Sequence, residues 1–268
     1  MAEKNNADRN FIDPIRVMQW EVEGSLARAG VLVDGLLYSK NLLPEQMEAL
    51  YKIKLTNLGL LARIRNYAEF YSRSDATSSL RLATYNAERF FSVVIEKILT
   101  FLEGKDVSIE LSCEIGEKSV VLDSRRIKVI LYNLLSNSII HAGRKSINIK
   151  INVFMRGDYL VIDITDNGKC ISEARRRKLF EVSEMMPVSK PEDVHLLKGL
   201  GLAVSRKLAR EMEGDVLYVP SSRYNRFEIT IPQSARYKYI NEDVTYIADS
   251  EEVEMYMADA IISLMNEN

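Results

Sequence analysis

Cysteine and histidine are scarce in this sequence, and long apolar runs are absent. Two residues of each scarce type occur among the 268: Cys113, Cys170, His141 and His195. The cysteines lack metal-ligand spacing, which argues against a zinc site or a disulfide framework and predicts a reducing, cytoplasmic location. No uninterrupted apolar run approaches the roughly 18 residues of a membrane span, so we expect no membrane insertion.

An excess of charge of one sign is also lacking. The 36 basic and 38 acidic side chains leave a formal net charge of -2. This balance predicts no nucleic-acid partner. The basic run Arg175–Lys178 is interpreted as the solvated face of a helix.

After a polar tail over residues 1–10, two heptad patterns predict a helical hairpin over residues 11–73. Each pattern places a mostly apolar stripe along one side of its helix. The stripe of the first helix consists of Ile15, Met18, Val22, Ser25, Ala29, Leu32 and Leu36, and that of the second consists of Leu50, Ile53, Asn57, Leu60, Ile64, Tyr67 and Tyr71. Two helices bury both stripes poorly, so we expect two chains to form a dimeric four-helix bundle. The alternative is a monomer whose hairpin packs on its own domain.

Residues 78–233 alternate between the periods of strands and helices. Strands are expected at Leu80–Thr84, Val107–Cys113, Ser119–Leu122, Ile147–Phe154, Tyr159–Thr165, Val216–Val219 and Phe227–Ile231, and helices at Ala87–Leu102, Arg125–His141, Glu173–Phe180 and Leu200–Met212. Asp123 is a candidate cap for the second of these helices. The order predicts an α+β fold, a two-layer sandwich of helices on a mixed sheet. The extension over residues 234–268 adds a possible strand at Tyr237–Ala248 and an amphipathic helix at Glu251–Met265.

Three short segments carry residues suited to nucleotide chemistry. Asn133 and Asn137 are four apart on one helix face, and an amide oxygen is a ligand that Mg²⁺ accepts. Asp166 ends an apolar strand, where a carboxylate can accept a hydrogen bond from an exocyclic amine, and Gly168 would admit a flat ring. Lys198-Gly-Leu-Gly201 opens a helix whose free N–H groups suit phosphates.

Each segment by itself has an ordinary explanation. Two asparagines on a helix are commonly solvated, and Asp-Asn-Gly is a common turn. A lone Gly-x-Gly is typical of a flexible helix start.

Together, "RRIKVILYNLLSNSIIHA", "DITDNGKCI" and "KGLGLAVSRKLAREMEGDVLYV" resemble the N, G1 and G2 boxes of sensor histidine kinases, which belong to the GHKL ATPase group. The resemblance covers about residues 82–232 and implies a Bergerat-type ATP-binding fold with ATP and Mg²⁺ as cofactors. The preceding hairpin resembles the dimerisation domain of these kinases in position and pattern.

The resemblance implies a role for each matching residue. Asn137 would hold Mg²⁺, Asp166 would read adenine with Gly168 against the base, and Gly199 and Gly201 would border the triphosphate. Asn133 would line the pocket. Lys169 or Lys198 would supply the phosphate contact of the family lysine that Ile140 replaces. The ATPases of the group have a glutamate at the position of Asn133. Because an amide takes no proton at neutral pH, efficient ATP hydrolysis is not expected.

The sequence departs from the kinase pattern at several positions. Trp20 and Glu21 stand about where the phosphoacceptor histidine would lie, so the hairpin cannot be phosphorylated by the usual route. Ile140 replaces a lysine, while Cys170 and Leu197 replace glycines.

Two functions remain open. One is a cytoplasmic signalling protein that binds ATP and acts on or with a response-regulator-like or kinase partner, as a phosphotransferase if it is active. The other is a catalytically inactive pseudokinase that serves as a dimeric docking module.

Overall fold

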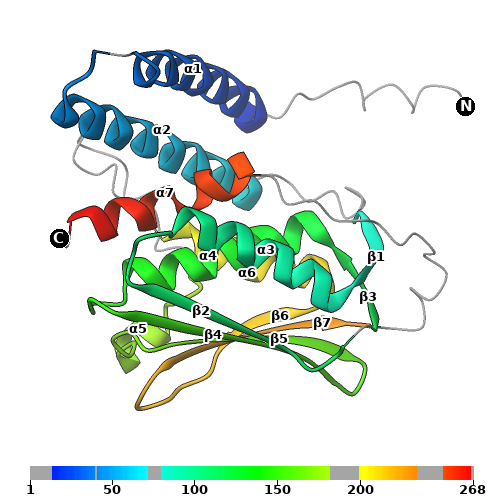
Figure 1. The fold of residues 1–268 in the computed structure, drawn as a ribbon. Helices are drawn as coiled ribbons and strands as arrows, with labels where there is room; N and C mark the ends of the chain where they lie inside the picture. The colour runs from blue at the N-terminus through cyan, green and yellow to red at the C-terminus, as the bar shows by residue number, and fades with distance from the viewer. Residues whose placement is uncertain are drawn as a thin grey trace, which may run out of the picture.

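Two long helices open the part of the chain that the structure describes. The computed structural model describes residues 14–39, 41–71, 80–116, 118–181, 199–233 and 250–266. Helices α1 (Pro14–Leu37) and α2 (Pro44–Tyr71) run antiparallel (Figure 1). The Asn57 side chain donates to the Leu26 carbonyl at 2.8 Å, which joins the middles of the two helices. The predicted hairpin is therefore present.

A five-stranded sheet forms the opposite layer of the molecule. Its order is β2 (Val107–Cys113), β4 (Ile147–Arg156), β5 (Tyr159–Asp166), β7 (Asn225–Pro232) and β6 (Asp215–Tyr218). Strands β2 and β4 are parallel, and the other neighbours are antiparallel. Alternate residues of β4 are buried, as its period-2 pattern predicts. A separate antiparallel pair joins β1 (Leu82–Asn86) to β3 (Ser119–Asp123).

Helices α3 (Ala87–Phe101), α4 (Ser124–Ile140) and α6 (Leu200–Glu211) cover one face of the sheet (Figure 1). The Asp123 carboxylate accepts a hydrogen bond from the Arg126 amide at 3.1 Å, so the predicted cap of α4 is confirmed. Most residues of α4 are buried because the helix is packed on several sides. The predicted α+β fold, helices layered on a mixed sheet, is confirmed, whereas the four-helix bundle of two chains remains a prediction.

The C-terminal helix α7 (Ser250–Asn266) lies between the hairpin and the sheet-covering helices, where it packs on α2, α3 and α4 (Figure 1). Val253, Met257 and Ala260 of α7 are fully buried in the main hydrophobic core. Charged residues of α7 form ion pairs with α2 and with α4. Glu254 pairs with Lys54 of α2, and Asp259 pairs with Arg63 of α2. Glu252 pairs with Lys128 of α4. Helix α7 thus joins the hairpin to the rest of the fold. The predicted domain boundaries remain a prediction.

One helix differs from the sequence-based expectation, and one expected strand is not tested. The helix expected at Glu173–Phe180 is wrong in its extent, since α5 is Glu173–Arg176. Beyond Arg176 the backbone amides bond to carbonyls three residues earlier, as Lys178 does to Arg175 at 3.1 Å, so the chain continues in tight turns. The possible strand at Tyr237–Ala248 lies outside the described residues.

Candidate functional site

Asp166 ends β5 and is 3% exposed. One carboxylate oxygen, Oδ1, accepts from the Gly168 amide at 2.8 Å and from the Asn225 side chain at 2.9 Å. The other oxygen, Oδ2, accepts from the Ser138 hydroxyl at 2.9 Å. A carboxylate oxygen has two lone-pair sites, so these contacts fill Oδ1 and leave one acceptor site on Oδ2.

Gly168 is held tightly in the loop that follows β5. A Cβ atom at this position would lie 2.7 Å from Asp166 Oδ1 and 3.0 Å from the Ala142 Cα. The next amide, that of Lys169, donates to the Ala142 carbonyl at 3.0 Å. The loop therefore packs its backbone against the end of α4 so closely that only glycine fits.

Asn225, at the start of β7, braces the same loop. Besides its bond to Asp166, its side chain donates to the Lys169 carbonyl at 3.2 Å and accepts from the Ile171 amide at 3.2 Å. Asn225 also faces Asp166 directly in the β5–β7 register. The loop from Asp166 to Ile171 is thus fixed from both α4 and β7.

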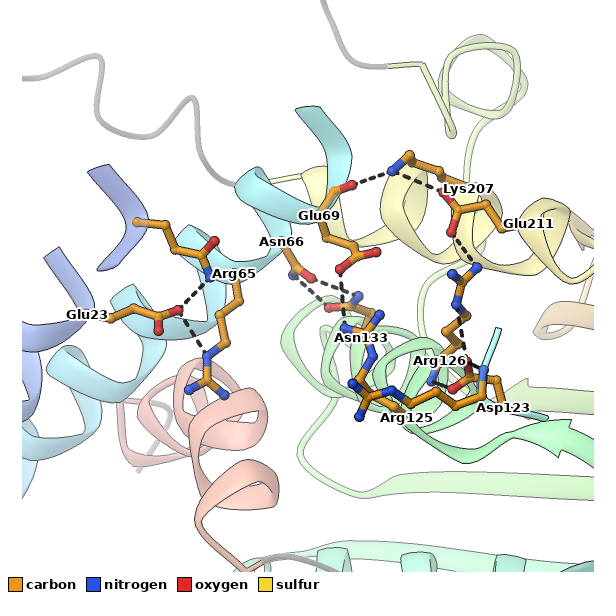
Figure 2. Close-up of polar contacts among 12 residues, drawn as sticks. Glu23, Arg65, Asn66, Glu69, Asp123, Arg125, Arg126, Asn133, Lys207 and Glu211 are labelled. Carbon is orange, nitrogen blue, oxygen red and sulfur yellow. Dashed lines mark hydrogen bonds and ion pairs between the residues drawn. The ribbon is translucent and has the colours of Figure 1, made fainter. Parts of the chain in front are cut away.

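Helix α4 contributes the two asparagines. Asn133 is 6% exposed and Asn137, one turn further along, is half-buried. Asn133 exchanges two hydrogen bonds with Asn66 of α2, at 2.9 and 3.3 Å (Figure 2). Ser138, which follows Asn137, reaches Asp166, so α4 connects the carboxylate to the asparagines.

Helix α6 begins beside Asn133. Gly199 precedes the helix with a φ of 108°, a left-handed conformation that glycine adopts without strain. A Cβ on Gly201 would lie 3.2 Å from Asn133 Oδ1, which places this asparagine against the first turn of α6. The first N–H groups of a helix have no partner within it and favour anions.

The last turn of α2 is bound to the start of α4 and to α6 (Figure 2). Arg125 contacts the Glu69 carboxylate at 3.4 Å, and Lys207 of α6 donates to the Glu69 carbonyl. Glu211 of α6 forms ion pairs with both Lys207 and Arg126. Arg126 also contacts Asp123 at 3.4 Å. These bonds fix the end of the hairpin helix beside the candidate site.

The structure describes six of the seven residues predicted for the cofactor site and brings two pairs of them into contact. Asn133 meets Gly201, Asp166 meets Gly168, and Gly199 opens the helix beside them. Lys198 lies outside the described residues, as do Leu197 and His195. The roles of all seven residues remain predictions.

Sequence reasoning missed Asn66 and did not foresee how Ser138 and Asn225 contact Asp166. Ser138 lies five residues beyond Asn133 and one beyond Asn137, a spacing that signalled only a neighbouring helix face. Asn225 supplies its side-chain donor from the start of β7, 59 residues beyond Asp166. No signal in the sequence indicated Asn66, because its partner is 67 residues away.

A metal ion would find few hard ligands in this region. Within the described ranges, no group of three or more histidine, cysteine, aspartate or glutamate side chains is placed to hold a metal. A single half-buried amide oxygen, that of Asn137, fits Mg²⁺ only if waters and phosphate oxygens complete its coordination, which is the usual situation at nucleotide sites.

The departures from the kinase pattern lie around this site. Ile140 and Cys170 are both half-buried, and His141, at the end of α4, is exposed.

Across the described part of the chain, no helix is long and apolar enough to cross a membrane.

Known proteins share this domain. Residues 122–235 match the family described as histidine kinase-, DNA gyrase B-, and HSP90-like ATPase. Histidine kinase P4 of Formosa agariphila is 21% identical over 200 residues, which are 74% of this chain and 14% of that protein. The aerobic respiration control sensor protein ArcB of Escherichia coli K12 is 31% identical over 97 residues, 36% of this chain and 12% of ArcB. This chain thus spans only a small part of the length of both relatives.

A solved structure agrees with the fold. Full-length ShkA in complex with AMPPNP superimposes with a TM-score of 0.62 at 20% identity, over 81% of this chain and 45% of that one. At this identity the likeness concerns the fold alone. The matched domain, the histidine kinase relatives and the fold agree: residues 122–235 form a histidine kinase-, DNA gyrase B-, and HSP90-like ATPase domain, and the chain is similar to sensor histidine kinases.

Proposed function

We propose that this chain binds ATP with Mg²⁺ and acts on or with a separate two-component-type protein, without phosphorylating its own hairpin. The observation that carries the proposal is the convergence of the Asp166 loop, the asparagine face of α4 and the glycine start of α6. ShkA, which shares the fold, was solved with the nucleotide analogue AMPPNP.

Each part of the site has a chemical task in this proposal. The remaining acceptor site on Asp166 Oδ2 receives a hydrogen bond from the amino group of adenine. The positive end of the α6 dipole, beyond Gly199 and Gly201, attracts the phosphates. Asn137 offers an oxygen to Mg²⁺, which neutralises phosphate charge when bound.

Self-phosphorylation and rapid hydrolysis do not fit the residues present. The hairpin over residues 14–71 contains no histidine, so it offers no imidazole nitrogen to accept a phosphoryl group. Asn133 stands where a general base would activate water, and an amide cannot take up the proton. Bound ATP therefore serves as a signal or as a phosphoryl donor to a partner protein, for which a response-regulator-like or kinase protein is the proposed class.

A second copy of the chain is the proposed partner of the hairpin. Helix α1 turns one side toward α2 and exposes apolar residues on the other, including Trp20 at 66%, Val31 at 71% and Leu32 at 70%. Met18, Leu32 and Leu36 of the predicted seam are all on the exposed side. Burying this face in a bundle of two chains removes apolar surface from water, which favours association.

A reducing, cytoplasmic location is part of the same proposal. Cys113 and Cys170 are both free thiols in the structure. Separate unpaired cysteines are typical of proteins kept in a reducing compartment.

The second candidate function is a docking module without nucleotide chemistry. Ile140 and Cys170 favour it, because the first removes a phosphate-binding lysine of the family and the second replaces a glycine of the G1 box. Under this alternative the fold persists as a surface for a protein partner, and nucleotide leaves it unchanged.

Labelled nucleotide separates the two candidates. The native protein is incubated with ATP labelled on the γ-phosphate, with Mg²⁺ or with EDTA, and is then assayed for retained label before and after denaturation. We expect Mg²⁺-dependent retention by the native protein and no label on the denatured chain. Lack of retention at millimolar ATP would favour the docking module. Covalent label on the hairpin would show that self-phosphorylation occurs.

A further inference from the structure

The hairpin helix α2 supplies a polar side chain to the edge of the candidate site. Asn66 donates to Asn133 Oδ1 at 2.9 Å, and Asn133 donates back to Asn66 Oδ1 at 3.3 Å (Figure 2). Both side chains are buried, with exposures of 8% and 6%. Water therefore has little access to replace either bond, and the amide pair holds both side chains in one orientation.

The pair leaves part of the Asn133 amide free for another partner. An asparagine side chain has two acceptor sites and two N–H donors, and Asn66 takes one of each. On its other side Asn133 adjoins the first turn of α6, because a Cβ on Gly201 would lie 3.2 Å from Asn133 Oδ1. Asn133 thus stands between α2 and the phosphate-binding end of α6 with its amide orientation fixed by Asn66.

The rest of α2 is anchored so that Asn66 stays in place. Glu69, one turn later, contacts Arg125 of α4 through its side chain and Lys207 of α6 through its carbonyl. On the preceding turn Arg63 pairs with Asp259 of α7. The docked position of α2 is therefore set by three helices, and the amide pair forms only when α2 is docked.

We propose that Asn66 is a positioning residue of the nucleotide site, and that docking of α2 and nucleotide occupancy stabilise each other through the Asn66–Asn133 pair. The inference rests on the proposed nucleotide site and adds a residue from the hairpin to it. Thermodynamic linkage requires the coupling to be mutual. Bound nucleotide therefore raises the equilibrium constant for docking of α2 by the same factor by which docking raises the affinity for nucleotide. A change in the docking of α2 then changes the affinity for nucleotide, and a change in nucleotide occupancy changes the docking of α2.

The variant Asn66→Ala tests the proposal by titration calorimetry with ATP and Mg²⁺. Loss of two buried hydrogen bonds frees the Asn133 amide to rotate, and we expect affinity to weaken about tenfold. The matched control is Arg65→Ala, because Arg65 is the adjacent residue of α2 but pairs with Glu23 of α1 at 3.2 Å. Its affinity should equal that of the natural chain.

Hydrogen exchange, measured in the natural chain and in Asn66→Ala, supplies a second test. ATP with Mg²⁺ should slow exchange of the backbone amides of residues 66–71, and Asn66→Ala should abolish the slowing. A purely structural role for Asn66 predicts no response of these amides to nucleotide.

The outcomes distinguish this inference from the proposed function. If the natural chain binds ATP, but Asn66→Ala binds equally well or more tightly, Asn66 does not position the site and the inference is wrong. Unchanged exchange at residues 66–71 in the nucleotide-bound natural chain would overturn it independently. If the natural chain binds no ATP, the proposed function fails first and this inference fails with it.

Discussion

Replacing Asp166 by two different residues should separate its part in folding from its part in binding. Asp166→Ala removes the acceptor for three donors: the Gly168 amide, the Asn225 side chain and the Ser138 hydroxyl. A buried donor left without an acceptor costs about 1–3 kcal/mol. Because the Ser138 hydroxyl can turn elsewhere, the free energy of unfolding should fall by about 3 kcal/mol or somewhat more.

Asp166→Asn should cost far less. The amide oxygen can take the place of Oδ1 and keep both bonds there, while the amide N–H₂ faces Ser138, whose hydroxyl can turn to accept. What is lost is the extra strength of bonds to a charged acceptor, so we expect a loss of about 1 kcal/mol.

Urea unfolding, extrapolated to water, measures both variants against the natural chain. Lys169→Ala is the control, since the Lys169 side chain is exposed and only its backbone joins the loop. Equal losses for the two Asp166 variants would refute the hydrogen-bond assignment. So would an alanine variant that unfolds at the same urea concentration as the natural chain.

Three further results are expected. Met257→Ala should destabilise the chain by about 3 kcal/mol in urea, because Met257 is fully buried in α7, whereas partly exposed Met155→Ala should cost less than about 1 kcal/mol. A cost below about 1 kcal/mol at Met257 would show that α7 is not part of the core. Leu32→Glu should halve the mass measured by sedimentation, because it places a charge on the proposed dimer face; a natural chain that sediments as a monomer would contradict the dimer. Asp215→Asn should lower stability at neutral pH by about 1 kcal/mol, and this difference should shrink and then vanish as the pH falls through the lowered pKa of Asp215. An unchanged dependence of stability on pH would contradict this.

The sign of the Asp215 effect follows from its pKa. Partial burial raises the pKa of Asp215, but hydrogen bonds from Arg206 and the Val216 amide and the nearby arginine charges lower it more, so the pKa lies below the ordinary 3.8. A group whose pKa is lowered by folding stabilises the folded state above its ordinary pKa. That contribution is lost as the pH falls through the lowered value.

Local signals in the sequence predicted most elements and the chemistry of the three segments. Strand β2 was expected with its observed bounds, since its alternating pattern is strong and Cys113 ends it before a turn. The Asp123 cap was predictable because the acceptor lies three residues before the donor amide. Such short-range rules involve neighbouring residues only.

Contacts between distant segments could not be predicted in this way. The apolar face of α7 indicated burial but not its partners α2 and α4, which precede it by more than 100 residues. In α1 the seam residues Met18 and Leu32 face away from α2 within the single chain, while Val33, which is not a seam residue, faces inward at 8% exposure. A helix with apolar residues around much of its circumference does not specify which side meets its neighbour.

The contacts of Asp166 show the same limit within the site. Its position at a strand end was evident from the sequence, but its two side-chain donors come from α4 and β7, 28 and 59 residues away. Asn66 reaches the site from still another element. The residue types of a site can thus be read from motifs, whereas the side chains that orient them depend on the packed fold.

Calorimetric titration with ATP and Mg²⁺, on the natural chain and on Asp166→Asn, tests the central claim most directly. The account predicts micromolar binding by the natural chain and a loss of about 100-fold in the variant, because an N–H₂ group then faces the amino group of adenine. The unfolding experiment shows whether the variant remains folded. No heat and no thermal stabilisation of the natural chain at millimolar ATP would contradict the account and leave the fold as a docking surface.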